Sequence, residues 1–142
     1  LILRTTGLFG PYPKGLDAFS RLRKADRLGE EFAAADDQFS QPIWAGELAR
    51  VIEKMAAGSE GGTFNAVGPD YVSRYDLAQR MRECFGFGRA RITRTITGVR
   101  KIRIPAHLKV SIAKIEKYVK IKPLGAQMET LGKEVENDTK QA

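Results

Sequence analysis

Three short segments of the sequence carry residue types that could bind or transform a ligand. The first, residues 5–12, reads Thr-Thr-Gly-Leu-Phe-Gly-Pro-Tyr and follows an apolar run. Its glycines would let the backbone approach a ligand closely, and the rings of Phe9 and Tyr12 could stack on one. Open α/β sheets bind ligands beyond the carboxyl ends of their strands, which is where this loop would lie. A plain Gly-Pro turn explains the same residues equally well, so both interpretations stay open.

The second segment places two carboxylates side by side, at Asp36 and Asp37, with Gln38 after them. Carboxylates that share a site shift each other's pKa, which suits acid–base chemistry. Neighbouring residues on an extended strand point to opposite faces, however, so these two side chains need not meet. We therefore favour solvated turn residues over an acid–base pair.

The third segment is basic. Residues 89–122 hold eleven Lys or Arg residues and one acid, Glu116, whereas the rest of the chain is slightly acidic although the whole carries +7. Within it, Arg100, Lys101 and Arg103 could clamp a phosphate, because arginine binds phosphate through two parallel hydrogen bonds. The segment could instead follow a nucleic-acid backbone or form a solvated rim. We favour phosphate binding for the arginine cluster and a solvated rim for the lysines that follow.

Composition excludes several kinds of site. The chain has 142 residues with one cysteine, Cys84, and one histidine, His107. An internal disulfide is therefore excluded, and we expect no metal site. No apolar run approaches the roughly 18 residues of a membrane span and no signal peptide precedes Arg4, so we expect a cytoplasmic location. The sequence contains no glycine-rich dinucleotide turn, no Walker loop and no G-x-S-x-G elbow, and we assign no catalytic residue.

Hydrophobic patterns predict the elements that would position these segments. Residues 1–3 form an apolar run typical of a buried strand in a parallel sheet, so the chain would begin inside that sheet. Alternation of strands and helices predicts an α/β fold. Further strands are expected at residues 32–35, 63–67 and 91–96, and helices at residues 16–28, 44–57, 73–85 and 111–118 and after Pro123.

Several short motifs occur along the chain in an order typical of one known protein family. Residues 3–10 read L-R-T-T-G-L-F-G, residues 37–43 read D-Q-F-S-Q-P-I and residues 73–78 read S-R-Y-D-L-A. Near the end come Arg103, Pro105, Leu108, Lys114 and Ile115. Together these resemble the C-terminal half of the extended short-chain dehydrogenase/reductase (NAD-dependent epimerase/dehydratase) family, in its dTDP-4-dehydrorhamnose reductase-like branch.

The sequence departs from that branch at several positions. Gly7 stands where the rhamnose reductases often have a tryptophan, and Ser40 and Ile43 replace the usual glycine and threonine. An extra residue separates Arg103 from Pro105. These departures bear on the identity of the substrate rather than on the family.

The resemblance implies a fold and an organisation. Residues 1–133 would supply the C-terminal part of a Rossmann-like parallel sheet and a small α/β substrate lobe, and residues 134–142 would be a polar tail. In the family, the N-terminal half binds NAD or NADP and carries the Tyr-x-x-x-Lys catalytic set. We therefore expect the isolated chain to be inactive and to bind neither cofactor tightly.

The resemblance also implies a site. Arg4, Thr5 and Thr6 would approach the cofactor of the full-length enzyme. The substrate, a nucleotide sugar, would contact Gly7, Leu8, Phe9, Gly10, Gln38, Arg100 and Arg103. The expected protein partner is the missing N-terminal half, a separate subunit or a second copy of the chain. Two alternatives remain: a non-catalytic regulatory or partner-binding member of the family, and a nucleic-acid binder that uses residues 89–122.

Overall fold

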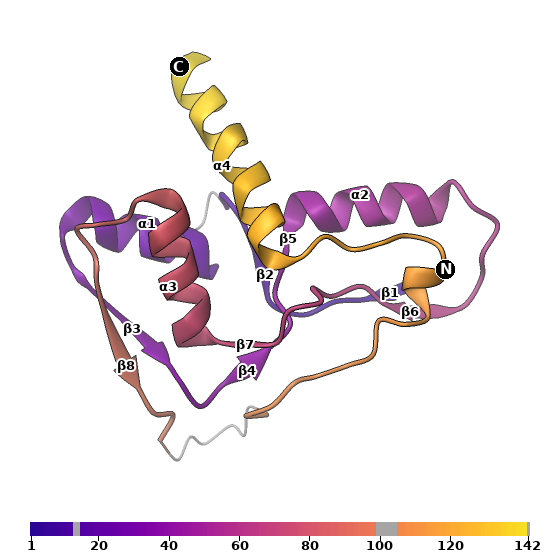
Figure 1. Cartoon of the computed structure of the whole chain (residues 1–142), viewed down its shortest axis with the longest axis horizontal. Coiled ribbons are helices and arrows are strands. Elements are labelled where there is room, and N and C mark those ends of the chain that lie inside the picture. The colour runs from indigo at the N-terminus through magenta and orange to yellow at the C-terminus, as the bar shows by residue number, and fades with distance from the viewer. Residues whose placement is uncertain (13–14, 99–104, 142) are drawn as a thin grey trace.

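The computed structural model describes residues 1–12, 15–98 and 105–141, in which short strands and four helices alternate (Figure 1). The strands are β1 (Ile2–Arg4), β2 (Leu8–Phe9), β3 (Glu31–Ala35), β4 (Phe39–Ser40), β5 (Ile43–Trp44), β6 (Thr63–Asn65), β7 (Val72–Ser73) and β8 (Arg91–Thr95). The helices are α1 (Ala18–Leu28), α2 (Ala45–Ala56), α3 (Arg74–Phe85) and α4 (Leu124–Gln141), with a 3₁₀ turn η1 (Ile115–Lys117) before α4.

The strands pair in twos. β1 with β6, β2 with β5 and β3 with β8 are parallel pairs, and β4 with β7 is antiparallel. Parallel neighbours require crossover connections, which the helices provide. The mixed α/β architecture with parallel strands confirms the predicted fold class.

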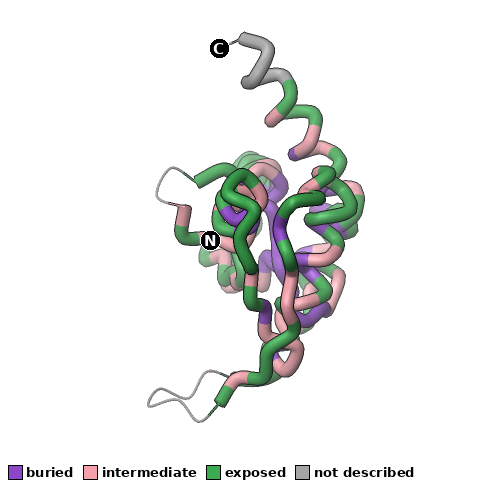
Figure 2. The backbone as a smooth tube through the Cα atoms, turned by 90° about the vertical axis from the view of Figure 1, so that its left-hand side faces the viewer, coloured by how far each residue is buried: buried purple, intermediate pink, exposed green. Residues whose placement is uncertain are grey.

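Two apolar clusters hold these elements together. In the first, α1, α3 and the start of α4 pack against β3 and β8, with Phe19, Leu22, Met81 and Leu131 almost fully buried. In the second, α2 packs over the β1–β6 pair and η1. The buried residues lie along the centre of the molecule, while the later part of α4 extends beyond it (Figure 2).

Helix α1 begins at an aspartate cap. The Oδ1 atom of Asp17 accepts hydrogen bonds from the backbone N–H groups of Phe19 at 2.9 Å and Ser20 at 3.1 Å. The same oxygen accepts from the N–H of Gly10 at 3.2 Å. Asp17 therefore satisfies two helix donors that would otherwise lack partners and ties the loop after β2 to α1.

Replacing Asp17 with alanine is expected to lower the free energy of unfolding by about 1–2 kcal/mol, the usual cost of a lost helix cap. Urea denaturation measures this. Asp17→Asn keeps an acceptor oxygen and should cost only a few tenths of a kcal/mol. Equal losses in the two variants would contradict a capping role.

The prediction that residues 1–3 form a buried strand is wrong about burial. β1 pairs with β6 alone among the described residues, and Leu1 and Ile2 are 51% and 59% exposed. Leu3 instead packs against the α2 cluster. Side chains alternate between the faces of a strand, and here only the face toward α2 is covered.

One prediction for the C-terminal third is also wrong. The expected helix at residues 111–118 is only the 3₁₀ turn η1, in a segment that two side-chain hydrogen bonds tie to β6. Asn65 Nδ2 donates to the Ser111 carbonyl at 3.0 Å, and Lys114 Nζ donates to the Thr63 carbonyl at 2.9 Å. The predicted polar tail begins within α4, which continues to Gln141, and Val135 packs against the first cluster.

Candidate functional site

The loop after β1 is held in place by glycine geometry and strand pairing. Gly7 has φ 54°, in the left-handed region, and its carbonyl accepts a hydrogen bond from the Ile43 N–H at 3.3 Å. A Cβ at this position would lie 3.3 Å from the Cα of Pro42. Both facts favour glycine here, because other residues are strained at positive φ. The tryptophan that many rhamnose reductases carry at this place would not fit this backbone.

A cleft of about 230 Å³ lies beside this loop. It is lined by Gly7, Leu8, Phe9, Leu16, Ala18, Arg21, Phe32, Ala34, Ser40, Pro42, Arg74 and Leu77. The structure thus brings three of the predicted substrate residues to one cleft: Gly7, Leu8 and Phe9. Apolar walls with a few polar groups are the usual make-up of a small-molecule site, and here the charged groups are both arginines.

Arg74 is the residue that sequence reasoning missed. It is the first residue of α3, directly after the cap Ser73, and its N–H donates to the Gln38 carbonyl at 3.0 Å. Its side chain is exposed and makes no ion pair with the described residues. A cation at a helix N-terminus opposes the helix dipole, and that unfavourable placement was the available signal.

The second arginine of this cleft, Arg21, comes from α1. Its guanidinium lies 5.7 Å from the centre of the Phe32 ring, within the range of a cation–π contact. Arg21 and Arg74 therefore bring two positive charges to one apolar cleft. Such a cleft suits an anionic ligand that also has apolar or ring surface.

A second cleft, of about 430 Å³, adjoins the first through Leu8, Phe9 and Leu16. Its other lining residues are Gly10, Pro11, Tyr12, Asp17 and Ala45. The Oδ2 atom of Asp17 is buried and has no hydrogen-bond partner within the part of the chain that the structure describes. Gly10, the fourth predicted substrate residue of the loop, lies in this cleft.

The remaining predicted residues lie elsewhere. Gln38 is 5% exposed and does not line either cleft, and its Oε1 atom has no partner among the described residues. Arg4 and Thr5 are exposed at the carboxyl end of β1, and the Thr6 hydroxyl donates to the Gln41 carbonyl at 3.3 Å. Arg100 and Arg103 lie outside the described residues, as does Lys101.

The paired carboxylates do not share a site. Asp36 accepts from the Ser73 hydroxyl at 3.1 Å and pairs with Arg94 at 3.4 Å. Asp37 accepts hydrogen bonds from the N–H and the hydroxyl of Thr97. Each carboxylate thus holds its own partner on or just after β8, in agreement with their interpretation as turn residues. In the described part of the chain, no three His, Cys, Asp or Glu side chains could hold a metal.

Within the described residues, no helix is both long and apolar enough to cross a membrane.

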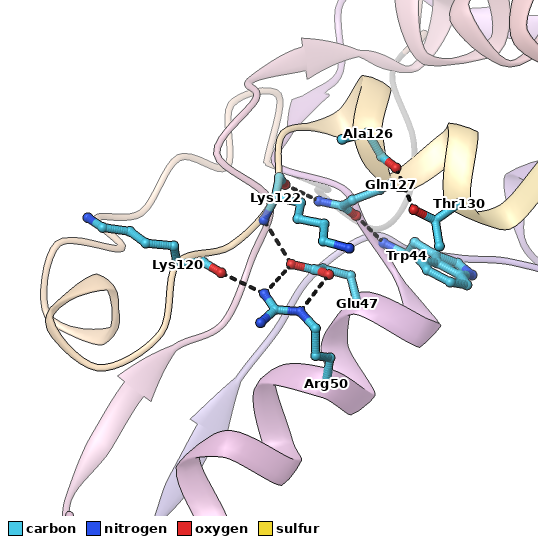
Figure 3. Close-up of polar contacts among 8 residues, drawn as sticks. All are labelled: Trp44, Glu47, Arg50, Lys120, Lys122, Ala126, Gln127 and Thr130. Atoms are coloured by element: carbon cyan, nitrogen blue, oxygen red, sulfur yellow. Dashed lines mark hydrogen bonds and ion pairs between the residues drawn. The ribbon is translucent and has the colours of Figure 1, made fainter.

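A polar network surrounds the buried side chains of Glu47 and Gln127 (Figure 3). Glu47, only 2% exposed, binds the Arg50 guanidinium and accepts from the Lys122 N–H at 2.8 Å. Gln127, fully buried, accepts from the Trp44 N–H at 2.8 Å and donates to the Lys122 carbonyl at 2.6 Å. The network joins α2, β5 and the start of α4. Because β5 pairs with β2, it also fixes the strand that carries Leu8 and Phe9.

The family model described as the RmlD substrate binding domain matches residues 1–136. The chain belongs to this family. A dTDP-4-keto-6-deoxy-D-glucose reductase of Streptomyces niveus is 28% identical over 91 residues, which cover 64% of this chain and 31% of that protein. The predicted resemblance to the dTDP-4-dehydrorhamnose reductase-like branch is thereby confirmed.

Solved structures show the same fold. A dTDP-4-dehydrorhamnose reductase from Bacillus anthracis, in complex with NADP, matches 94% of the chain described here with a TM-score of 0.79 at 18% identity. A UDP-glucuronic acid 4-epimerase from Bacillus cereus, in complex with UDP-glucuronic acid and NAD, matches 96% with a TM-score of 0.72 at 18% identity. The chain spans 47% and 45% of these two proteins, so it corresponds to about half of each.

Proposed function

We propose that this chain is the substrate-binding half of an NAD(P)-dependent enzyme that reduces, epimerises or dehydrates a nucleotide sugar. The match to an RmlD substrate binding domain over residues 1–136 carries this proposal. The reductase and epimerase named above act on, or are bound to, nucleoside-diphosphate sugars. The cleft beside the Gly7 loop has the chemistry such a ligand needs, with two arginines for the diphosphate and apolar walls for the sugar ring.

The cleft beside the Gly7 loop adds Arg74 to the substrate residues predicted from the sequence. Gly7, Leu8 and Phe9 would line the sugar, Gly10 would shape the adjoining cleft, and Arg74 would bind the diphosphate. Gln38, Arg100 and Arg103 keep their predicted substrate roles as expectations. Gln38 has a buried oxygen that could accept a hydrogen bond from a ligand.

We expect that the residues of this chain do not suffice to bind NAD or NADP tightly. The chain contains no glycine-rich phosphate turn, which dinucleotide sites of this class require. Arg4 and Thr5 are exposed at the end of β1 and could contact one end of NAD or NADP, whereas the hydroxyl of Thr6 is already engaged. We therefore expect no tight cofactor binding and no turnover by this chain alone, and we assign it no chemical step.

Titration of the chain with dTDP-glucose, followed by the amide signals in NMR spectra, tests the proposal. Shifts should concentrate at residues 7–10 and at the start of α3. Arg74→Gln should weaken binding about tenfold, because hydrogen bonds between charged groups contribute about 1.5–3 kcal/mol. Arg82→Gln, on the same helix but outside the cleft, should leave the affinity within about twofold.

A chain that binds no nucleotide sugar but captures another polypeptide would support the alternative of a non-catalytic partner-binding module. One observation favours contact with another polypeptide, whether the N-terminal half or a separate partner. Leu1 and Ile2 are exposed at the start of β1, which has one strand neighbour among the described residues. The nucleic-acid alternative finds less support. Of the described cations in residues 89–122, Arg91, Arg94, Lys114 and Lys120 bind groups of the chain itself.

A further inference from the structure

A third cleft lies along the face of α1 that carries Arg23 and Lys24. Its volume is about 560 Å³, within the usual range for small-molecule sites. It is lined by Pro11, Tyr12, Gly15, Ser20, Arg23, Lys24 and Arg27. None of these residues lines the cleft that contains Arg74.

Helical periodicity gathers the cations of this cleft. Arg23, Lys24 and Arg27 follow Ser20 at spacings of three, four and seven residues, so all four lie on one face of α1. The opposite face carries the buried residues Phe19, Leu22 and Ala25. Three cations on one face repel one another, so the arrangement is unfavourable in the absence of an anion.

The described part of the chain does not neutralise these cations. Arg23, Lys24 and Arg27 make no ion pair with any residue that the structure describes. No acidic residue is among the described residues that line the cleft. Asp26, the acid of this helix, instead accepts from the N–H groups of Arg89 and Ala90 at 2.7 and 3.0 Å.

Ser20 holds in place the loop that forms another wall of this cleft. Its hydroxyl accepts from the Tyr12 N–H at 3.0 Å and donates to the Gly10 carbonyl at 3.0 Å. These bonds hold the Pro11–Tyr12 backbone against the first turn of α1. The Tyr12 side chain is 49% exposed and lines the cleft, so its hydroxyl can donate to a ligand.

From this geometry we propose a second ligand site, in which Arg23, Lys24 and Arg27 bind a small phosphorylated anion with Tyr12 at its edge. Guanidinium groups match the oxygens of phosphate in paired hydrogen bonds, and lysine adds a point charge. The site shares no lining residue with the cleft that contains Arg74, whereas Pro11 and Tyr12 also line the adjoining second cleft.

Pyrophosphate titration of the whole 142-residue chain at constant ionic strength tests the proposal. Saturable amide shifts are expected at residues 11–12 and 20–27. A parallel titration with glycerol 3-phosphate separates a free polyphosphate from a phosphate ester, and saturation by either probe at these residues supports the site. The proposal would be overturned if the shifts saturate with neither probe, or if they map to residues 89–122.

Charge-matched variants separate a site from general attraction. The triple variant Arg23→Gln, Lys24→Gln, Arg27→Gln should weaken pyrophosphate binding at least about tenfold. The control Lys54→Gln, Arg82→Gln, Lys117→Gln removes the same charge from exposed positions elsewhere and should change the affinity by less than about twofold. Equal weakening in both variants would refute a defined site. Arg27→Gln alone, with an expected weakening of about threefold, repeats the test should the triple variant lose its fold.

Discussion

Gly68→Ala is expected to destabilise the protein by about 3 kcal/mol, because overpacking at a site that cannot relax lies at the upper end of its usual cost. Gly68 is buried, and a Cβ there would overlap the carbonyl oxygen of Pro42. The overlapping atom belongs to the backbone, so no side-chain rotation can relieve it. Urea denaturation measures the loss.

The consequences should reach the proposed site. The Gly68 carbonyl accepts a hydrogen bond from Gln41 Nε2 at 3.1 Å, and Pro42 lines the cleft beside Gly7. A displaced Pro42 should therefore also shift the amide signals of residues 7–9. Gly125→Ala is the matched control: no atom lies within 4 Å of its added Cβ, and stability should change by less than about 1 kcal/mol. Equal denaturation midpoints for Gly68→Ala and the native chain would disprove the close approach.

Local signals predicted most of the elements correctly. Ser73 caps α3 by accepting from the Asp76 N–H at 3.0 Å, and Gly86 ends that helix in the left-handed conformation, which confirms the helix predicted at residues 73–85. In α1 the predicted inward residues Phe19 and Leu22 are buried. These outcomes depend on contacts within a few residues, which is the information that a sequence pattern carries.

Where the predictions were wrong, distant contacts decided the outcome. Residues 111–118 have a helical pattern, but only the turn η1 forms there, in a segment that hydrogen bonds tie to Thr63 and Asn65 on β6. Tertiary contacts override local preference, and a single sequence does not reveal them.

The candidate site shows the same division. The Gly7 loop was predicted from its own residues, but its charged partners were not. Arg21 and Arg74 meet in one cleft because α1 and α3 both pack against β3. Gln38 was assigned to the substrate from a motif and is buried next to the start of α3, where its carbonyl accepts from the Arg74 N–H. A motif identifies residues near a site without stating which of them face the ligand.

Glu47→Gln is expected to lower the free energy of unfolding at neutral pH by about 2 kcal/mol, in line with hydrogen bonds that involve a charged group. The carboxylate binds Arg50 in a bidentate pair and accepts from the Lys122 N–H (Figure 3). Glutamine keeps one acceptor but loses the charge and turns an N–H₂ group toward a donor. Thermal or urea unfolding measures the difference.

The pH dependence of that difference identifies the carboxylate as its source. Burial raises the pKa of Glu47, but the hydrogen bonds from Arg50 and Lys122 outweigh it and hold the pKa below its usual value of 4.5. The unfolded chain therefore binds this proton more tightly than the folded protein. The stabilisation by Glu47 is complete above about pH 4.5 and is lost as the pH falls through the folded-state pKa. The gap between the native chain and Glu47→Gln should close over that interval.

The exposed pair of Glu116 and Lys120 supplies the matched control for this experiment. Its charged atoms are 4.0 Å apart and the lysine side chain is 81% exposed, so Glu116→Gln should cost less than about 1 kcal/mol at any pH. Other carboxylates titrate in the native chain and in both variants, so they cancel from each difference. A gap for Glu47→Gln that stays constant from neutral to acidic pH would mean that packing, rather than the buried charge, makes Glu47 important. In that case the network of Figure 3 would stabilise β5, and with it Leu8 and Phe9 on the paired strand β2, through the packing of its side chains.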